Sequence, residues 1–235
     1  MRARNGHLHW WPGDTPFEVC LGAILTQNTS WINVERAIAN LKRADLLECR
    51  RMLALPAERL AALLRPAGYF NVKTRRVRAF LDMLVNSFDG DLTRLFAGPA
   101  AVARERLLAV NGIGPETADS MLLYAGGHSS FVVDAYTKRI FQRHGWCSAG
   151  ATYEELQTLC VAALSHTPKS CRLDYWQDYH AQIVIVGKDY CRKSQPRCSD
   201  CPLESLTGET FCKQDKFLRC VERVKDSTER GVDCR

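Results

Sequence analysis

Apolar residues recur along the chain with the spacing of amphipathic helices. Residues 15–18, Thr-Pro-Phe-Glu, have the form of a capping box with proline at the first helical position. The apolar residues that follow fall on one helical face: Phe17, Cys20, Leu21, Ile24 and Leu25. The same period predicts further helices near 31–42, 57–65, 71–86, 99–109, 115–125, 135–144, 152–165 and 173–187. Val132-Val133 is too short to found a sheet, so the pattern predicts an all-α chain.

Length and composition limit the number of cores. With 235 residues, 46% of them hydrophobic, the chain can bury one substantial core or two modest ones. The sequence has no internal repeat and no long Gly/Ser/Pro linker, so we expect any second domain to pack against the first. After Cys212 the residues become polar and charged, and we expect a poorly ordered end.

The charge of the chain is mildly positive and unevenly distributed. Lys and Arg number 32 against 26 Asp and Glu, a net charge of +6, which permits a polyanionic partner without proving one. Residues 73–78 hold four cations and no acid, and Lys138, Arg139 and Arg143 form a second group. Either run, taken alone, could equally be a solvated helix face.

Cysteine usage depends on the compartment. No apolar stretch is long enough to cross a bilayer, and residues 1–14 lack the apolar segment of a secretion signal. We therefore expect a reducing, cytoplasmic location without membrane contact. There, the eleven cysteines indicate buried thiols and a metal site more than a disulfide framework.

Residues 107–119 have the pattern of a helix, a glycine-flanked turn and a second helix that begins with Pro115. Gly112 and Gly114 would let the backbone approach a ligand closely, and the N–H groups at the start of the second helix suit a phosphate. An ordinary interhelical turn would look much the same. Farther along, Asp134 stands where a helix N-cap belongs, and capping alone would explain it if no motif preceded it.

Cys191, Cys198 and Cys201 are separated by six and then two residues, and Cys212 follows after ten more. Three cysteines in so short a segment indicate metal ligation. Iron–sulfur clusters and zinc both accept four thiolates, so the spacing leaves that choice open.

A helix-hairpin-helix followed at this distance by Val133-Asp134 resembles the DNA glycosylase superfamily that includes endonuclease III, and the resemblance runs from Pro16 through Cys212. It implies that Asp134 is catalytic and supports departure of a base from its sugar. Bifunctional members carry a lysine where this chain has Glu116. A carboxylate cannot form a Schiff base, so the resemblance implies a monofunctional enzyme with water as nucleophile.

The cysteine segment resembles the [4Fe–4S] loop of endonuclease III, both in its six-then-two spacing and in residues 187–191, Gly-Lys-Asp-Tyr-Cys. The resemblance implies a [4Fe–4S] cluster on Cys191, Cys198, Cys201 and Cys212. The last interval is longer than in that family, so Cys220 is the alternative fourth ligand. The implied role of the cluster is structural, presenting Arg192, Lys193 and Arg197 to DNA.

Three further segments look like the type III 3-methyladenine DNA glycosylases: residues 10–12 (Trp-Trp-Pro), 21–29 and 65–73. By that similarity Trp10, Trp11, Pro12, Trp31 and Glu116 form the base pocket. Gln27 and Tyr69 match the positions that plug and wedge the DNA. The remaining expected DNA contacts are Asn71, Lys73, Gly112, Gly114, Thr117, Lys138, Arg192 and Lys193. The type III enzymes do not carry the cysteine cluster, so this chain combines features of two branches.

Together these features predict an all-α, two-domain fold of the helix-hairpin-helix glycosylase type. Residues 16–134 would form a helical barrel domain, residues 1–15 with 135–225 a discontinuous cluster domain, and residues 226–235 a disordered tail. The expected function is excision of a damaged base from double-stranded DNA by a monomer, nucleoid-associated in a bacterium, with an alkylated purine as substrate. Two alternatives stay open: a glycosylase for oxidised, deaminated or mismatched pyrimidines, and a non-catalytic iron–sulfur DNA-binding protein.

Overall fold

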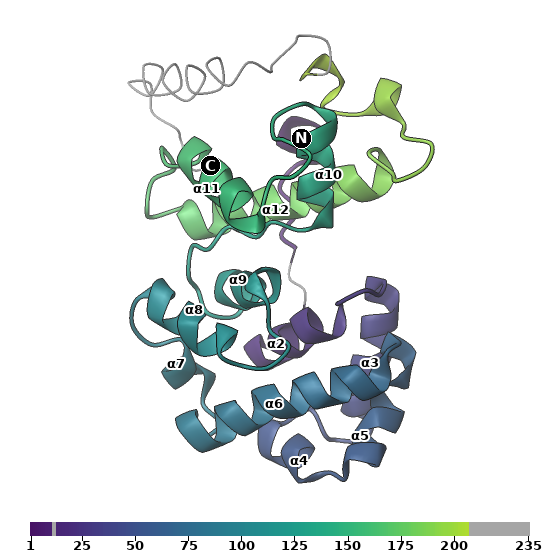
Figure 1. Ribbon diagram of the computed structural model, residues 1–235, viewed down its shortest axis with the longest axis vertical. Coiled ribbons are helices and arrows are strands. Elements are labelled where there is room, and N and C mark those ends of the chain that lie inside the picture. Colours follow the sequence, from purple (N-terminus) through teal and green to yellow (C-terminus); the bar gives the residue numbers. More distant parts are fainter. Residues whose placement is uncertain (11–12, 207–235) are drawn as a thin grey trace. The chain divides into compact units, whose positions relative to one another are not determined.

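The computed structural model describes residues 1–10 and 13–206, and in this part of the chain helices are joined by turns and loops without any strand (Figure 1). The all-α prediction is therefore confirmed. The chain divides into two compact units. We call residues 11–130 the hairpin unit, and residues 1–10 together with 131 onward the aspartate unit. None of the described helices is long and apolar enough to cross a membrane.

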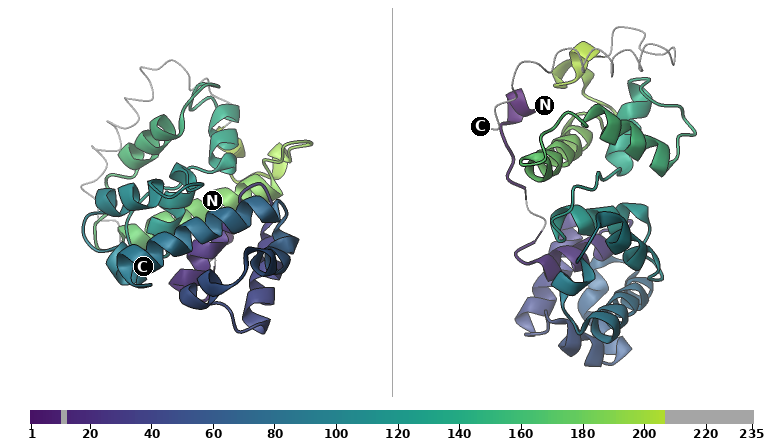
Figure 2. Two further views of the ribbon diagram at one scale, coloured as in Figure 1. Left: turned by 60° about the horizontal axis from the view of Figure 1, so that its bottom comes forward. Right: turned by 90° about the vertical axis from the view of Figure 1, so that its left-hand side faces the viewer.

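The hairpin unit, whose helices are drawn mostly in shades of blue in Figure 2, is built around its longest helix, α6, which is labelled in Figure 1. Its elements are α2 (Pro16–Leu25), α3 (Trp31–Arg43), α4 (Cys49–Ala54), α5 (Ala57–Leu64), η1 (Arg65–Ala67), α6 (Phe70–Phe88), α7 (Leu92–Leu95), α8 (Ala100–Leu108) and α9 (Pro115–Tyr124). Helices α2, α4, α5 and α7 all contact α6. The short helices α4 and α7 were not predicted.

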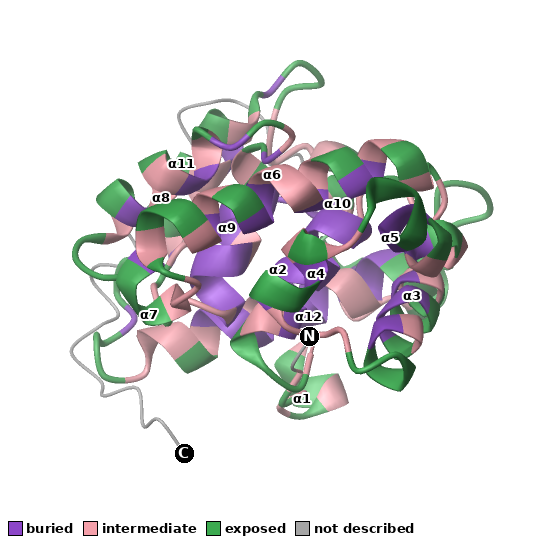
Figure 3. Cartoon of the chain, turned by 90° about the horizontal axis from the view of Figure 1, so that it is seen from below, coloured by how far each residue is buried: buried purple, intermediate pink, exposed green. Residues whose placement is uncertain are grey.

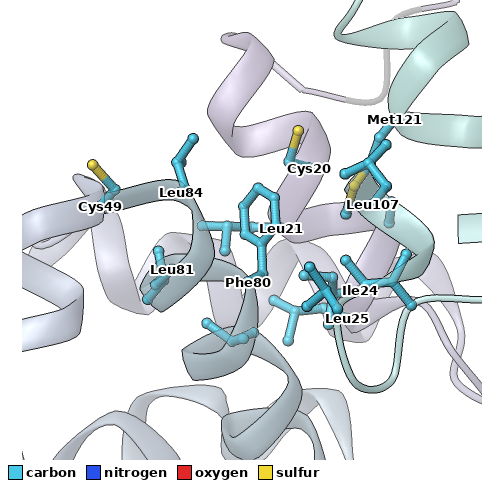
Figure 4. Close-up of a cluster of buried hydrophobic side chains, with 14 of the residues drawn as sticks. Cys20, Leu21, Ile24, Leu25, Cys49, Phe80, Leu81, Leu84, Leu107 and Met121 are labelled. Atoms are coloured by element: carbon cyan, nitrogen blue, oxygen red, sulfur yellow. The ribbon is translucent and has the colours of Figure 1, made fainter. Parts of the chain in front are cut away.

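One apolar cluster fills the hairpin unit. Figure 4 shows Phe80 and Leu84 of α6 among side chains of α2, with Leu107 of α8 and Met121 of α9 nearby. The buried residues of α3 lie on one face at helical spacing: Val34, Ala37, Ile38 and Leu41 (Figure 3). Burial of this apolar surface is the main contribution to the stability of such a unit.

The start of α2 follows its sequence signal in part. Thr15 Oγ1 accepts a hydrogen bond from the Glu18 backbone N–H at 3.2 Å, and Pro16 occupies the first turn. The Glu18 carboxylate instead lies 2.7 Å from the Lys42 ammonium of α3. The Glu18 carboxylate is thus paired with a charged partner from another helix, in place of the second half of the predicted capping box.

The aspartate unit contains the two ends of the described chain. Its elements are α1 (Arg2–Asn5), α10 (Ala135–Arg143), α11 (Tyr153–Ala163), α12 (Arg172–Asp189), η2 (Cys198–Asp200) and η3 (Glu204–Leu206). Helices α10 and α12 pack together closely: a Cβ at Gly187 would lie 2.6 Å from Tyr136 Cβ. Thr152 and Glu155 form a complete capping box at the start of α11. The short helix α1 was not predicted.

Candidate active site and cysteine loop

Asp134 is the N-cap of α10, and its two carboxylate oxygens have different surroundings. Oδ1 accepts hydrogen bonds from the Thr137 backbone N–H at 2.7 Å and from Thr137 Oγ1 at 2.8 Å. Oδ2 lies 3.7 Å from His180 Nε2 of α12. The helix therefore fixes the carboxylate through one oxygen and leaves the other directed at an imidazole.

The surroundings of Asp134 favour its charged form. Burial acts to raise the pKa of this carboxyl, but the nearby imidazole of His180 and the hydrogen bonds from Thr137 outweigh burial, so the pKa lies below its ordinary value. Asp134 is therefore a carboxylate at neutral pH. A fixed, largely buried negative charge is suited to stabilising a cation that develops next to it.

Polar side chains of α12 hold the N-terminal segment. Those that contact it are spaced four residues apart on the helix: Asp174, Asp178 and Gln182. The Asp178 carboxylate accepts the Leu8 N–H at 2.9 Å. The Gln182 amide accepts from the Asn5 side chain at 2.8 Å and donates to the Gly6 carbonyl at 2.7 Å. Sequence reasoning missed these anchors, although their i, i+4 spacing is a recognisable signal.

This segment ends at Trp10, whose ring centroid is 6.1 Å from that of His180. The structure thus brings Trp10, predicted for the base pocket, and Asp134, predicted to be catalytic, to the same histidine. Trp11 and Pro12, the other predicted stacking residues, lie outside the described residues.

The predicted hairpin lies between α8 and α9. Gly112 has φ of 90°, in the left-handed region, and a Cβ there would overlap the Arg76 side chain. Gly114 is the N-cap of α9, and a Cβ there would meet nothing within 4 Å. The turn therefore has open space beside the N-terminus of a ten-residue helix, as anion binding requires.

Gln27 is bound to this hairpin. Its amide nitrogen donates to the Gly112 carbonyl at 3.1 Å and to Thr117 Oγ1 at 3.0 Å. Its amide oxygen accepts from the Arg76 guanidinium. Three residues expected to contact DNA, Gln27, Gly112 and Thr117, thus form one hydrogen-bonded group.

The other expected DNA contacts differ in exposure. Tyr69 is 72% exposed with φ of 45°, and Asn71 beside it is also exposed. Lys138, Arg192 and Lys193 are exposed in the aspartate unit. Each of these side chains is therefore available to a nucleic acid.

Lys73 requires a correction. Only 1% of this residue is exposed, and its ammonium donates to the Ala67 carbonyl at 2.6 Å. Burial, and then the charge of Arg76, lower the pKa of Lys73. We expected a phosphate contact, but this side chain lies on the buried face of α6 and supports the turn before it.

Trp31 begins α3 and lines a cavity of about 200 Å³ in the hairpin unit. Three carboxylates and one ammonium also line it: Asp14, Glu18, Glu35 and Lys42. Lys42 lies 2.7 Å from oxygens of both Asp14 and Glu18, and these two bonds raise its pKa. The cavity lining therefore combines one aromatic side chain, Trp31, with a group of charged side chains whose net charge is negative.

Glu116 is exposed in the first turn of α9. Its backbone carbonyl accepts a hydrogen bond from Ser120 Oγ at 2.7 Å. An acid in a first turn is also favoured by the helix dipole.

The cysteine loop follows α12 and is held by two arginines of α10. Arg139 donates to the Gly187 and Cys191 carbonyls at 2.8 and 2.7 Å. Arg143 donates to the Arg192 and Lys193 carbonyls and lies 3.4 Å from Cys191 Sγ. Helix α10 thus fixes the path of the chain around the first cysteine.

Three of the predicted metal ligands are described. Cys191 is buried, Cys198 exposed and Cys201 half-buried. Burial is the largest cause that raises the pKa of Cys201, and a backbone hydrogen bond at Leu203 opposes it. Within residues 1–10 and 13–206, no three Cys, His, Asp or Glu side chains are already grouped as a metal site. Cys212 and its alternative Cys220 lie outside the described residues. Thiols of this kind on one loop fit an iron–sulfur cluster chemically.

Comparison with known proteins gives a consistent picture. Residues 21–165 match the family described as "HhH-GPD superfamily base excision DNA repair protein". A Methanocaldococcus jannaschii protein named "Putative DNA repair glycosylase" is 45% identical over 203 residues, which are 86% of this chain and 89% of that protein. Endonuclease III of Bacillus subtilis is 25% identical over 207 residues, 86% of this chain and 85% of its own length.

Two solved structures are also similar. The H. pylori 3-methyladenine DNA glycosylase bound to 1,N6-ethenoadenine has a TM-score of 0.64 and 29% identity, covering 76% of this chain and 87% of its own. A non-covalent endonuclease III–DNA complex has a TM-score of 0.69 and 22% identity, covering 91% and 87%. At 22% identity, the similarity to the endonuclease III complex supports the fold alone.

Proposed function

The chain belongs to the HhH-GPD superfamily of base excision DNA repair proteins and is a DNA glycosylase, and we propose that it releases an alkylated purine, such as 3-methyladenine, by direct hydrolysis. Double-stranded DNA that contains the damaged base is the proposed partner. The observation that carries the proposal is the fixed, ionised Asp134 in the aspartate unit.

Asp134 would act on the sugar. Departure of the base leaves a sugar that resembles an oxocarbenium ion, and a fixed carboxylate stabilises such a cation. The same carboxylate could orient and deprotonate the attacking water. An alkylated purine carries a positive charge and leaves as a neutral base, so the reaction needs no general acid.

Glu116 supports hydrolysis without strand cleavage. It occupies the first turn of α9, where a lysine would be needed to attack the sugar and form an imine. A carboxylate lacks the amine for this step. Water is then the proposed nucleophile, and no covalent enzyme–DNA intermediate forms.

The cavity beside Trp31 supports the choice of a cationic base. Stacking on an indole face is strengthened by about 0.5–2 kcal/mol when the partner is a cation. Glu18 and Glu35 add negative charge to the same lining. Likeness to a 3-methyladenine DNA glycosylase points to the same substrate class. In our proposal Trp10, Trp11 and Pro12 also contact the extruded base.

The hairpin would bind a phosphate of the DNA backbone. Backbone N–H groups around Gly112 and Gly114, at the start of α9, suit a phosphate. Gln27 and the exposed Tyr69 would occupy the space left by the extruded nucleotide, and base extrusion costs a few kcal/mol that such contacts partly offset.

We also propose a [4Fe–4S] cluster on Cys191, Cys198, Cys201 and Cys212. When bound, it would cross-link the loop that Arg139 and Arg143 hold, without supplying a group to hydrolysis. Iron and sulfide analysis of anaerobically purified protein tests this. We expect about four irons per chain. Stoichiometric zinc without iron, in protein produced with adequate iron, would exclude the cluster.

An excision assay tests the substrate. Duplexes carrying 3-methyladenine, 7-methylguanine, thymine glycol, uracil or a mismatch are incubated with the protein, and released bases and abasic sites are measured. We expect 3-methyladenine to be released fastest, without strand cleavage. Preferential release of thymine glycol, uracil or a mismatched base would favour the pyrimidine-specific alternative. Efficient borohydride trapping of the protein on damaged DNA would contradict the monofunctional mechanism.

A further inference from the structure

We propose that His180 is a positioning residue for Asp134, holding the second carboxylate oxygen so that Asp134 stays ionised and correctly oriented during base release. This inference rests on the glycosylase function proposed above. No substrate contact is assigned to His180. It acts through Asp134 alone.

The first reason is that the two carboxylate oxygens of Asp134 have different partners. Thr137 binds Oδ1 twice, at 2.7 and 2.8 Å, as part of the helix cap. His180 Nε2 is 3.7 Å from Oδ2. At this separation the contact is electrostatic, and a small movement of either side chain would make it a hydrogen bond. Hydrogen bonds of catalytic groups are often long in the absence of substrate and shorten when it binds.

The second reason is burial. The side chains of His180 and Asp134 are 7% and 12% exposed, so water screens their interaction only weakly. The ring of Trp10 lies beside His180 at 6.1 Å between centroids. A buried imidazole interacts strongly with a nearby charge, and Asp134 Oδ2 lies within 3.7 Å of it.

The third reason is that the neighbouring charges are already engaged elsewhere. The titratable and charged groups on the elements around His180 include Asp134 and Arg139 (α10), Tyr153 (α11), Arg2 and His7 (N-terminal segment), and Asp174 and Asp178 (α12). Arg2 lies 3.7 Å from Asp178, and His7 lies 3.0 Å from Asp174. Arg139 donates to backbone carbonyls at the end of α12. The Tyr153 hydroxyl meets the Val133 N–H at 3.5 Å. Among these groups, His180 is the one directed at Asp134 Oδ2.

Removing His180 should therefore change how Asp134 titrates. The interactions with His180 are the largest of those that lower the pKa of Asp134, and burial opposes them. Without His180, only Thr137 would stabilise the charged form, so the pKa of Asp134 would rise. Base release requires the carboxylate, and its rate would then fall at a higher pH than in the wild type.

The experiment compares His180→Phe with His180→Gln in single-turnover excision across a pH series. The phenylalanine removes the polar contact, whereas the glutamine amide retains a donor. We expect His180→Phe to move the acid limb of the profile upward by about one pH unit, a tenfold loss on the acid side, with recovery at alkaline pH. His180→Gln keeps a donor but no charge, so it should move the acid limb upward by less than His180→Phe does. His166→Gln, at an exposed position, is the matched control.

A second measurement does not depend on activity. Carboxyl carbon NMR of protein labelled at aspartate follows the Asp134 titration directly, and Asp134→Asn identifies the signal by its loss. We expect this carboxyl to titrate at higher pH in His180→Phe. The same titration in both proteins, or a rate reduced by one constant factor at every pH, would overturn the proposal.

Failure of this inference is distinguishable from failure of the proposed function. If Asp134→Asn excises at the wild-type rate, the catalytic role of Asp134 is wrong. If Asp134→Asn is inactive while His180→Phe keeps the wild-type profile and titration, only the role of His180 is wrong. Circular dichroism of both His180 variants shows whether each remains folded.

Discussion

The hairpin unit and the aspartate unit are stabilised in different ways. Around α6 the buried residues are mainly apolar, with Phe80, Leu81 and Leu84 fully buried. In the aspartate unit, α12 alone carries four buried polar side chains: Gln177, Asp178, His180 and Gln182. The apolar packing around α6 depends on filled volume, although the hairpin unit also buries Lys73 and Asp119, each with a polar partner. The aspartate unit depends on pairing, because a buried polar group that loses its partner is costly. The carboxylate we propose to be catalytic lies in the unit that depends on pairing.

Asp134→Asn should have the largest effect and should separate chemistry from stability in the aspartate unit. Asparagine also caps helices well, so the free energy of unfolding should change little. The negative charge is lost, and we expect single-turnover base release to fall about 10³-fold or more. Fluorescence anisotropy with damaged duplex should show that DNA binding persists. A wild-type excision rate would contradict the catalytic role.

Phe80→Ala tests the dependence of the hairpin unit on volume. Phe80 is fully buried in the apolar cluster, and its truncation should lower the free energy of unfolding by about 3–5 kcal/mol. Urea denaturation measures this change. Val102→Ala, at a position 39% exposed, is the control and should cost about 0.5 kcal/mol or less. Equal losses for the two variants would be inconsistent with this core.

Asp178→Ala tests the dependence of the aspartate unit on pairing. The half-buried Leu8 N–H would lose its acceptor, and we expect the free energy of unfolding to fall by about 1–3 kcal/mol. Limited proteolysis should then cut more readily within residues 1–10. Asp178→Asn keeps an acceptor oxygen and should be milder. Equal protease sensitivity of the alanine and asparagine variants would show that the acceptor oxygen of Asp178 does not hold the N-terminal segment.

Glu48→Gln should have the smallest effect on the free energy of unfolding, and this effect should depend on pH. The Glu48 carboxylate accepts the backbone N–H groups of Arg50 and Arg51 at 2.9 and 2.8 Å. Burial raises the pKa of Glu48, but these bonds outweigh it and the pKa is lowered. Its charge therefore stabilises the fold above the ordinary carboxyl pKa, and this contribution is lost as pH falls through the lowered value.

At neutral pH we expect the free energy of unfolding of Glu48→Gln to be about 0.5–1 kcal/mol lower than that of the wild type. Urea denaturation at a series of pH values measures it. The difference should shrink on acidification. A constant difference at all pH values would show that the charge of Glu48 does not contribute.

The sequence predicted the long helices well, because their apolar spacing and caps are local signals. The predicted 135–144 and 173–187 correspond to Ala135–Arg143 and Arg172–Asp189. Short helices such as Cys49–Ala54 were missed because fewer than two turns provide too little periodicity.

The site was harder to predict where its partners are distant in sequence. Lys73 was grouped with a basic run, although its spacing from Val77, Phe80 and Leu84 places it on the buried face of α6. His180 carried no signal, because α12 is buried on several sides and its pattern does not distinguish a core histidine from one that meets Asp134. Trp11, Pro12 and Cys212 lie outside the described residues, so their roles stay predictions.

Helix α10 carries Asp134 at its first cap and, later on one side, the two arginines that hold the cysteine loop. Inserting or deleting one residue within it would rotate everything beyond that point by about 100°. Depending on its position, the change would separate the carboxylate, Arg143 alone or both arginines from their partners. Substitutions on the exposed side of α10 should be tolerated in related sequences, whereas a change in its length should not. The number of residues between Asp134 and Arg143 is thus a constraint on how this protein can evolve.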